Sequence, residues 1–376
     1  IEPHDSVERF ERLGVKVIEA FGSFISPTEL QAGNIIITAR RFVISTGSSP
    51  LVPPIPGLDD VPYYTNEDIF DLREQPKHLI VIGGGPIGME MAQTHHRLGS
   101  GVTVLEGAKA LGNDDPEAVA VVLENIRAEG VEIVEDAIVS AVYGKAGSIQ
   151  VETKDGLTYT GSHLLVAVGR QPNLEKLNLA SAGIASLSGG IKVDASLKTT
   201  NKKVYAIGDV TAGLQFTHVA GYHAGVVIRS ALFGLRSKQR TDHIPWATYT
   251  EPELAQVGLT EAQALDVYGK KLEVVKFNYD ANDRARAELK TKGFVKVMVV
   301  KGKPLGATIA GAQAGELIQV WALAIANKMK MRAVVGMVSP YPTLGEVNKC
   351  VAGSYFAPSL FESGFLKRFV RFVQWF

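Results

Sequence analysis

The residues best placed to do chemistry are glycines at GxGxxG spacing, which lie within the stretch GGGPIG. In a dinucleotide-binding loop, Gly83 permits a tight turn, Gly85 lets the backbone approach a pyrophosphate, and Gly88 lets a helix pack close to a strand. A helix that begins here offers free N–H groups and a partial positive charge to a diphosphate. The candidate loop residues are Gly83, Gly85, Pro86, Ile87 and Gly88.

A single carboxylate completes this pattern. Glu106 lies 18 residues beyond Gly88, at the end of an apolar run. At that distance a carboxylate can accept hydrogen bonds from both hydroxyls of an adenosine ribose. A 2′-phosphate in the same place would meet like charge, so we expect NAD(H) in preference to NADP(H).

Three elements must position these residues. Leu79–Ile82 is predicted to be a buried strand, Met89–Arg97 a helix, and Val102–Leu105 a second strand that ends at Glu106. GxGxxG spacing alone is a weak signal, and an ordinary βαβ unit is the alternative. The ordered set of strand, helix, second strand and terminal acid favours a nucleotide site.

Length, net charge and cysteine count limit the class of protein. The 376 residues suffice for two or three domains, and 39 basic residues balance 39 acidic ones, so no net field favours nucleic acid or an anionic partner. Cys350 is the single cysteine, which excludes an internal disulfide and fits a reducing compartment such as the cytoplasm. No run approaches the length of a transmembrane span. The sequence opens on Ile1 within what reads as the middle of a domain, so we expect an N-terminal portion to precede it.

The remaining pattern alternates strands and helices. Near the start we expect a helix over Asp5–Leu13, capped by Asp or Ser, then a strand over Val15–Glu19. The proline-rich stretch Ser48–Gly57 is interpreted as a linker. Further helices are expected over Pro116–Glu129, His218–Phe233, Thr260–Val267 and Gly315–Asn327.

Five stretches, in this order, resemble the pyridine nucleotide-disulfide oxidoreductases, the flavoenzymes that include dihydrolipoamide dehydrogenase, glutathione reductase and mercuric reductase. They are similar to the second flavin motif, the NAD(P) loop, the turn that ends that domain, the third flavin motif and the start of the dimerisation domain. In that order the stretches are Ser45–Gly47, Gly83–Gly88, Gly169–Asn173, Tyr205–Asp209 and Pro245–Glu261. Asn282–Ala285 is similar to the mercuric-reductase-like branch.

The resemblance implies an α/β fold with two Rossmann-like nucleotide-binding domains, of which the FAD domain is partial, and an α+β dimerisation domain. The domains expected are 1–60 and 176–242 for FAD, 61–175 for NAD and 243–350 for dimerisation, followed by a tail over 351–376.

The resemblance also implies roles for single residues. Asp209 would hydrogen-bond a ribitol or phosphate oxygen of FAD, the helix near His218 would face the flavin, and Glu90 would lie near the nicotinamide. Each has a plainer alternative: a capping acid in a turn, a surface or capping histidine, and a helix carboxylate without a function. The further cofactor contacts implied are Ser45, Thr46, Gly47, Gly169, Gly208 and Ala220.

Two departures from the family pattern bear on the reaction. The first GxGxxG and the CxxxxC redox pair are absent, and we expect the preceding residues to carry them. Tyr341 stands where the disulfide reductases have a proton-shuttling histidine, while Glu346 is retained. Because a phenol titrates near ~10 and an imidazole near ~6.5, Tyr341 is a poor base at neutral pH. Alternatively, Tyr341 packs in an interface. Mercuric reductase has a similar tyrosine, but this chain ends without a vicinal cysteine pair.

These observations predict an FAD-dependent, NAD(H)-preferring oxidoreductase that works as a homodimer. Tyr341 and Glu346 of the partner subunit would complete a site for an acceptor, either a disulfide or thiolate-bound soft metal, or a quinone or other small molecule. No resident metal is expected. The rival hypothesis is a non-catalytic dimeric scaffold that binds dinucleotides.

The last residues predict an amphipathic helix. Phe361–Phe376 places Phe365, Leu366, Phe369, Val373 and Phe376 on one face and Lys367, Arg368 and Arg371 around the other. Such a helix can lie on a membrane surface or pack on the body of the protein or on the partner subunit. We favour packing.

Overall fold

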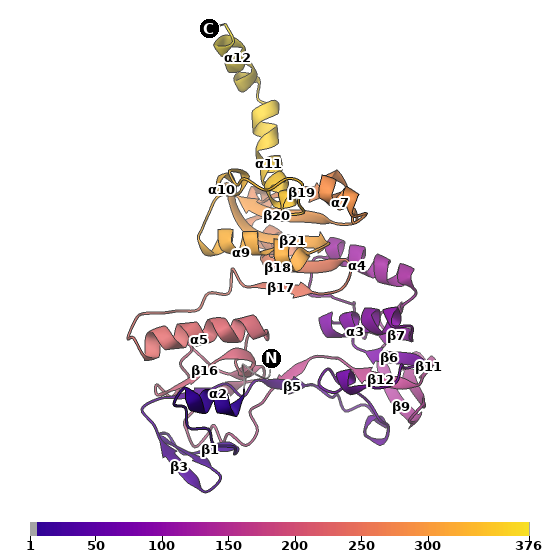
Figure 1. Ribbon diagram of the computed structural model, residues 1–376, viewed down its shortest axis with the longest axis vertical. Coiled ribbons are helices and arrows are strands. Elements are labelled where there is room, and N and C mark those ends of the chain that lie inside the picture. Colours follow the sequence, from indigo (N-terminus) through magenta and orange to yellow (C-terminus); the bar gives the residue numbers. More distant parts are fainter. Residues whose placement is uncertain (1–5, 376) are drawn as a thin grey trace. The chain divides into compact units, whose positions relative to one another are not determined.

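The computed structural model describes residues 6–375 and divides the chain into two compact units (Figure 1). The first unit combines the residues up to Ser49 with Arg170–Gln239. The second combines Pro50–Gly169 with the residues from Arg240 onward. Each unit is therefore built from two separate stretches of sequence, so contacts within a unit join residues far apart along the chain.

The first unit contains a small antiparallel sheet and a parallel strand pair. Strands β1 (Gly22–Ser26), β2 (Glu29–Ala32) and β3 (Ile35–Thr38) form the sheet, and β4 (Phe42–Ile44) pairs in parallel with β16 (Val204–Ala206). Phe24, Ile44, Val204 and Ala206 share one buried core. The shorter pairs are β5 (Ser48–Pro50) with β13 (Arg170–Pro172) and β14 (Ser186–Leu187) with β15 (Gly190–Ile191).

Among the described residues, helices α2 and α5 belong to this unit, and one expected strand is not formed. Helix α2 (Val7–Arg12) begins after Ser6, whose Oγ accepts the N–H of Arg9, whereas Asp5, the other expected cap, lies outside the described residues. Helix α5 covers Thr217–Ala231. The strand expected over Val15–Glu19 is wrong, because that segment has no strand partner.

The second unit begins with the predicted βαβ arrangement. A four-stranded parallel sheet has the order β12 (His163–Val166), β6 (His78–Ile82), β7 (Gly101–Leu105) and β8 (Glu132–Val134). Val, Ile and Leu fill both faces of β6, as expected for a central parallel strand. Helices α3 (Pro86–Arg97) and α4 (Pro116–Glu129) connect the strands, and α4 ends at Gly130 in a left-handed conformation. A separate antiparallel sheet consists of β9 (Val139–Lys145), β10 (Ser148–Thr153) and β11 (Thr158–Gly161).

A five-stranded antiparallel sheet forms the other half of this unit. Its order is β17 (Pro245–Thr248), β18 (Glu253–Gly258), β21 (Lys303–Gly311), β20 (Phe294–Val300) and β19 (Glu273–Asn278). Trp321 is buried in its core and donates its indole N–H to Asn348 Oδ1 at 2.7 Å. The helices here are α6 (Glu261–Tyr268), α7 (Asp283–Ala287), α8 (Ala314–Leu317), α9 (Gln319–Ala326), α10 (Met331–Val335) and α11 (Glu346–Phe361).

A buried lysine joins the two halves of the second unit. The ammonium of Lys296, on β20, lies 2.8 Å from Asp115 Oδ2, and both side chains are almost wholly buried. Asp115 also caps α4 by accepting the N–H of Glu117. Glu117 and Glu261 are the other carboxylates that contact this ammonium, at 3.1 and 2.7 Å. Burial alone would lower the pKa of Lys296, but the hydrogen bonds to these three carboxylates raise it instead.

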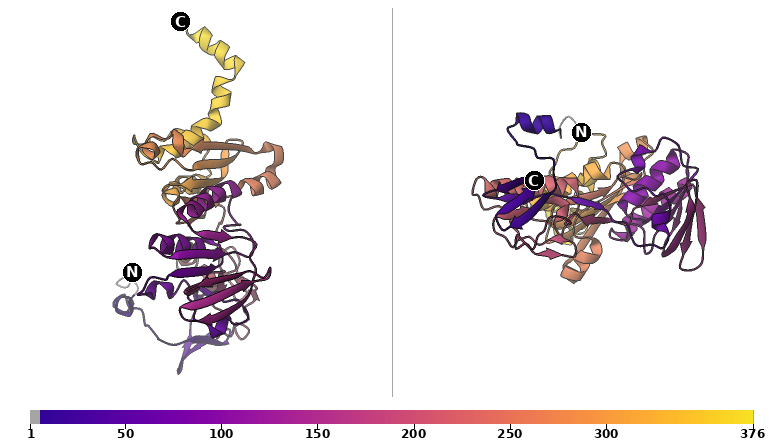
Figure 2. Two further views of the ribbon diagram at one scale, coloured as in Figure 1. Left: turned by 90° about the vertical axis from the view of Figure 1, so that its right-hand side faces the viewer. Right: turned by 90° about the horizontal axis from the view of Figure 1, so that it is seen from below.

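The chain ends in helix α12 (Gly364–Val373), which follows α11. Figures 1 and 2 show α12 standing clear of the five-stranded sheet on which α11 packs. None of the residues of α12 is buried. Within residues 6–375, no helix has the length and apolar character needed to cross a bilayer.

Candidate functional site

In the first unit, strands β4 and β16 bring two of the predicted motifs to one edge. The strands are parallel neighbours, with Ile44 opposite Ala206. Ser45–Gly47 directly follows β4, and Gly208–Asp209 follows β16 after one residue. Ligands of open α/β sheets bind at the carboxyl ends of the strands. The predicted residues Ser45, Thr46, Gly47, Gly208 and Asp209 therefore gather where such a ligand would bind.

Hydrogen bonds between side chains connect residues at this edge that are more than a hundred positions apart in the sequence. Ser48 donates its hydroxyl to Asp209 Oδ2 at 2.7 Å and accepts the Arg170 Nε–H at 2.7 Å. The guanidinium of Arg170 also donates to the Ser48 carbonyl oxygen, and its Nε lies 4.0 Å from Asp209. The Asp209 carboxylate is thus held beside a serine hydroxyl and a cation.

Asn173 fixes the other side of the Ser45–Gly47 segment. Its side-chain amide donates to the Thr46 carbonyl oxygen at 3.0 Å, and its backbone carbonyl oxygen accepts the Thr46 hydroxyl at 2.8 Å. Its backbone N–H donates to the carbonyl oxygen of Gly47, which has a φ of 68°. Ser48, Arg170 and Asn173 were not predicted as site residues, although Arg170 and Asn173 belong to the motif GRQPN that the sequence singles out.

Helix α5 approaches the same edge. Gly208 has a φ of 68°, and a Cβ built on it would lie 3.0 Å from the Cβ of Ala220, so the helix packs closely on this turn. Buried His223 accepts the Gly208 N–H through Nδ1. No side chain caps the N-terminus of α5, where exposed His218 stacks on the ring of Phe216. The structure therefore brings Ala220 against the third flavin motif, and it stacks the His218 ring on Phe216.

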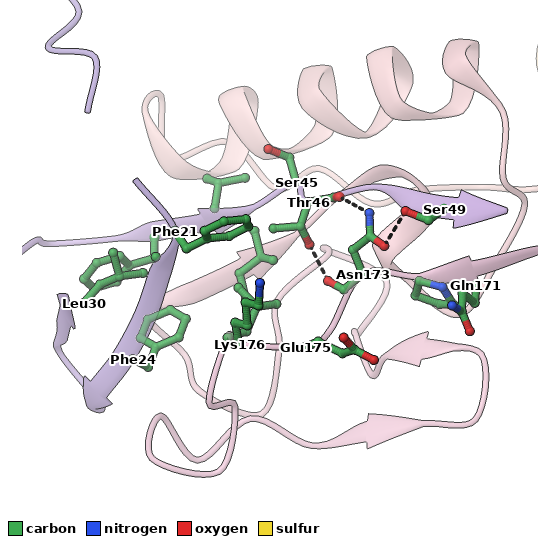
Figure 3. Close-up of a pocket in the computed structure, with 16 residues that line it drawn as sticks. Phe21, Phe24, Leu30, Ser45, Thr46, Ser49, Gln171, Asn173, Glu175 and Lys176 are labelled. Atoms are coloured by element: carbon green, nitrogen blue, oxygen red, sulfur yellow. Dashed lines mark hydrogen bonds between the residues drawn. The ribbon is translucent and has the colours of Figure 1, made fainter. Parts of the chain in front are cut away.

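A cavity of about 700 Å³ opens beside the Ser45–Gly47 segment (Figure 3). Ser45, Thr46 and Asn173 line it, together with the aromatic rings of Phe21 and Phe24. Figure 3 shows the two hydrogen bonds between Thr46 and Asn173 at its wall. Gly208, Asp209, His218 and Ala220 are not among its lining residues.

In the second unit, the glycine-rich loop has the geometry that its spacing predicts. Gly83 has a φ of 107°, and a Cβ at Gly83 would collide with the carbonyl oxygen of Ala167. A Cβ at Gly88 would collide with the carbonyl oxygen of Gly83. A Cβ at Gly85, by contrast, would meet nothing within 4 Å. The first and third glycines are therefore required by packing, and the second leaves its backbone open to a ligand.

Helix α3 starts directly from this loop. Gly85 occupies the N-cap position and Pro86 the first turn, where its missing N–H costs nothing. No side chain caps this helix end. Pro86 is exposed and Ile87 is half-buried, so both border the open side of the loop.

Glu106 is bound to the loop by its carboxylate. One oxygen accepts the Gly84 N–H at 2.6 Å, and the other accepts the Ala108 N–H at 2.8 Å. Glu106 lies at the end of β7, beside the loop at the end of β6, because these strands are parallel neighbours. The sequence predicted this proximity but not the hydrogen bond to the loop.

The predicted residues Gly169 and Glu90 lie elsewhere in this unit. Gly169 is exposed, with a φ of 129°, and its carbonyl oxygen accepts the Leu51 N–H. Glu90, on α3, accepts the backbone N–H of Tyr249 at 2.8 Å. Burial raises the pKa of Glu90, and the hydrogen bond from Tyr249 opposes that rise.

Tyr341 pairs with a carboxylate that the sequence did not assign to it. Its hydroxyl donates to Asp283 Oδ2 at 2.8 Å, and its side chain is 71% exposed. The hydrogen bond to Asp283 and the charge of that carboxylate raise the pKa of Tyr341. Glu346 instead accepts the Thr343 N–H at 3.4 Å. Asp283 lies in the Asn282–Ala285 motif, which the sequence singles out. Its hydrogen bond to Tyr341 was not predicted.

Comparisons with known proteins identify the family. The family profile described as pyridine nucleotide-disulphide oxidoreductase matches residues 5–224, and the profile of its dimerisation domain matches residues 244–351. The chain belongs to this family. The resemblance inferred from the motifs is therefore confirmed, as is the fold class with its two nucleotide-binding domains and dimerisation domain.

Individual relatives agree with this assignment. The chain is 35% identical over 354 residues to mercuric reductase from Staphylococcus aureus, covering 92% of this chain and 64% of the relative. It is 31% identical over 347 residues to dihydrolipoyl dehydrogenase from Bacillus subtilis, covering 88% of this chain and 74% of the relative. The HOCl-induced flavoprotein disulfide reductase RclA from Escherichia coli superimposes with a TM-score of 0.84 at 31% identity, covering 92% of this chain and 82% of that structure. The chain spans 55% of the length of mercuric reductase from Bacillus cereus.

The residues present fit both cofactors that this family uses, FAD and a pyridine nucleotide. For the nucleotide, the backbone at Gly85 is open and Glu106 lies beside the loop. For the flavin, the Asp209 carboxylate stands at a strand edge beside the start of α5, which no side chain caps. Among residues 6–375, no cluster of three His, Cys, Asp or Glu side chains could hold a metal ion.

Proposed function

We propose that this protein is an FAD-dependent oxidoreductase that takes hydride from NADH and passes electrons to a disulfide, a thiolate-bound metal or another small acceptor. The observation that supports this most directly is that each unit has its own nucleotide-type site at the carboxyl edge of parallel strands, one at β4 and β16 and one at β6 and β7. Flavin, when bound, supplies the chemistry that accepts a hydride and releases electrons to a different acceptor.

The second unit would bind NADH through its loop and its acid. The backbone at Gly85 and the first turn of α3 would hold the pyrophosphate, because this helix end carries unpaired N–H dipoles and a partial positive charge. Glu106 would accept hydrogen bonds from the adenosine ribose while it continues to hold the Gly84 N–H, since each carboxylate oxygen has two lone pairs. The same negative charge would disfavour a 2′-phosphate.

The first unit would hold the flavin through Asp209 and the start of α5. Ser48 and Arg170 orient the Asp209 carboxylate, which would accept hydrogen bonds from hydroxyl groups of the cofactor. The positive end of the α5 dipole would stabilise negative charge on a reduced flavin. Thr46 and Asn173 keep the adjacent segment in place through their paired hydrogen bonds.

The acceptor is proposed from the residues around Tyr341. Because Asp283 raises the pKa of Tyr341, this side chain stays protonated at neutral pH and cannot serve as a base. The phenol has a single proton, which it donates to Asp283, so it would donate to an acceptor such as a mixed disulfide or a soft metal bound by thiolates only by exchanging Asp283 for that acceptor. The similarity to several proteins named mercuric reductase supports such an acceptor, and a quinone ranks second.

We also propose a homodimer, because the chain contains the dimerisation domain of the family. Tyr341 and Glu346 would then act in the site of the partner subunit. The exposure of Tyr341 is consistent with a role outside its own subunit.

The test is an anaerobic titration of the purified protein, produced from its complete reading frame, with NADH and then NADPH. The expected result is a bound-flavin absorbance band that NADH bleaches at lower concentration than NADPH. A thiolate-to-flavin charge-transfer band would identify a dithiol step, and its absence would favour direct transfer to the acceptor. A protein that binds NADH but shows no flavin band would support the dimeric scaffold instead and refute the proposed oxidoreductase.

A further inference from the structure

Helix α12 separates charge and apolar surface almost completely. At 3.6 residues per turn, Phe365, Leu366, Phe369 and Val373 share one face, as the sequence predicts. Lys367, Arg368 and Arg371 occupy the opposite face, and the helix contains no acidic residue. The helix thus carries three positive charges in ten residues of a chain that is neutral overall.

The apolar face of α12 is exposed to solvent in this chain. Phe369, near the centre of the face, is 53% exposed, and Phe365 is more exposed still. Leu366 is half-buried, and its backbone N–H donates to the Ser363 hydroxyl at the first turn of the helix. The expectation that this helix packs on the body of its own subunit is therefore wrong, whereas packing on the partner subunit stays a prediction. Phe376, which was assigned to the same face, lies outside the described residues.

Helix α12 also lies beyond the domain that defines the family. The dimerisation profile ends at residue 351, within α11, and α12 begins at Gly364. The last residues that pack on the core of the five-stranded sheet are Tyr355 and Phe356 on α11, and no residue of α12 belongs to that core. A function for α12 can therefore be separate from the folding of that domain.

We propose that α12 binds the surface of an anionic phospholipid bilayer and attaches the protein to it. An anionic bilayer complements this charge pattern, because its surface would meet all three cations of α12 at once. A basic helix with aromatic residues on its other face lies in the plane of the interface, with the apolar face among the acyl chains. Trp375, 90% exposed and just beyond the helix, is of the residue type enriched at that depth.

The experiment measures co-sedimentation of the whole protein with vesicles of phosphatidylcholine alone and with 30% phosphatidylglycerol. Each basic residue near an anionic surface strengthens binding about fivefold, so the three together should give roughly a hundredfold preference for the anionic vesicles at low salt. Emission from Trp375 should shift to the blue on binding. Trp375→Phe should abolish that shift while sedimentation persists.

Matched variants distinguish a specific role of α12 in binding from a general effect of adding negative charge to the protein surface. Phe369→Asp should abolish sedimentation, while Leu265→Asp, at a 56% exposed position on α6, should not. The triple variant with Lys367, Arg368 and Arg371 changed to Glu should lose the anionic preference. The same change at Lys145, Lys154 and Lys270, three exposed lysines outside α12, should keep it.

Two results would overturn the proposal. The first is equal or absent binding to both kinds of vesicle. The second is a change of oligomeric state in Phe369→Asp without any vesicle binding by the wild type, which would assign the apolar face to a second copy of the chain. None of these readouts uses flavin or NADH, so failure here leaves the proposed oxidoreductase untouched.

Discussion

Glu106 has two proposed roles, to hold the glycine-rich loop and to select NADH over NADPH, and substitutions at this residue can separate them. The Gly84 N–H that it accepts is buried, so water cannot replace this partner, whereas the exposed Ala108 N–H can turn to water. A hydrogen bond to a charged acceptor contributes about 1.5 to 3 kcal/mol. We expect Glu106→Ala to loosen the loop and to weaken NADH binding by roughly tenfold to 150-fold, and to weaken NADPH binding less, because the charge that repels its 2′-phosphate is removed as well.

The second task is selection between the coenzymes. Two unit charges 4 Å apart repel by about 1 kcal/mol in water and by about 4 kcal/mol in an effective dielectric of ~20. Glu106→Gln removes the charge but keeps a carbonyl oxygen for the Gly84 N–H. We therefore expect the ratio of the NADPH and NADH dissociation constants to fall by at least about fivefold, with a smaller loss of NADH affinity than in Glu106→Ala.

The assay is a fluorescence titration of each variant with NADH and with NADPH, which measures binding without any turnover. Glu124→Gln is the matched control, because it removes the same charge from an exposed position on α4. It should leave both dissociation constants unchanged. An unchanged coenzyme ratio in both Glu106 variants would refute the role in selection. Unchanged affinities in Glu106→Ala would refute the role in holding the loop.

Three further predictions follow from other contacts. Lys296→Met leaves the Asp115 carboxylate buried without its cation and should lower the free energy of unfolding by about 3 to 5 kcal/mol in urea at pH 7; a loss below about 1 kcal/mol would contradict this account. Because burial raises the pKa of Glu90 above its ordinary value of 4.5, ionised Glu90 opposes folding, an effect that is absent below pH 4.5 and complete above the folded pKa. Glu90→Gln should therefore raise the unfolding temperature more at pH 8 than at pH 4, and an equal change at both would be inconsistent. Asp283→Asn should lower the pKa of Tyr341, seen in ultraviolet titration as a difference that vanishes when Tyr341→Phe is added; no shift would show that Asp283 does not bind the phenol.

The dinucleotide loop could be predicted because its signals are local. Apolar runs of strand length, glycines at fixed spacing and an acid at a strand end all lie within 28 residues, Leu79–Glu106. Parallel pairing of β6 with β7 then brings Glu106 to the loop without any long-range information. The helix over Pro116–Glu129 was likewise predicted with the bounds that the structure shows, because Gly130 marks its end.

The hydrogen-bond partners that hold Asp209 and Tyr341 could not be predicted in the same way. Ser48 and Asp209 are separated by 161 residues, and Tyr341 and Asp283 by 58, so no spacing rule connects them. The error at Val15–Glu19 has a similar cause. A segment can have strand-like composition, but only a neighbouring strand makes it a strand, and none pairs with this segment.

Contacts from the segment around Asn282 explain why the Tyr341 phenol stays protonated and does not act as a base. Asn282 is buried, and its Oδ1 accepts the Ala285 N–H as the cap of α7, while its Nδ2 donates to the Thr343 carbonyl oxygen at 3.1 Å. The next residue, Asp283, accepts the Tyr341 hydroxyl. Two adjacent residues thus fix both ends of the short Tyr341–Thr343 stretch, and both ends of the Asn282 amide are used, so aspartate at 282 could cap the helix but could not hold Thr343. The phenol consequently has a fixed partner that also keeps it protonated. A histidine in its place would also have its pKa raised by this carboxylate, but an imidazole titrates close enough to neutral pH to take up and release a proton, which the phenol does not do.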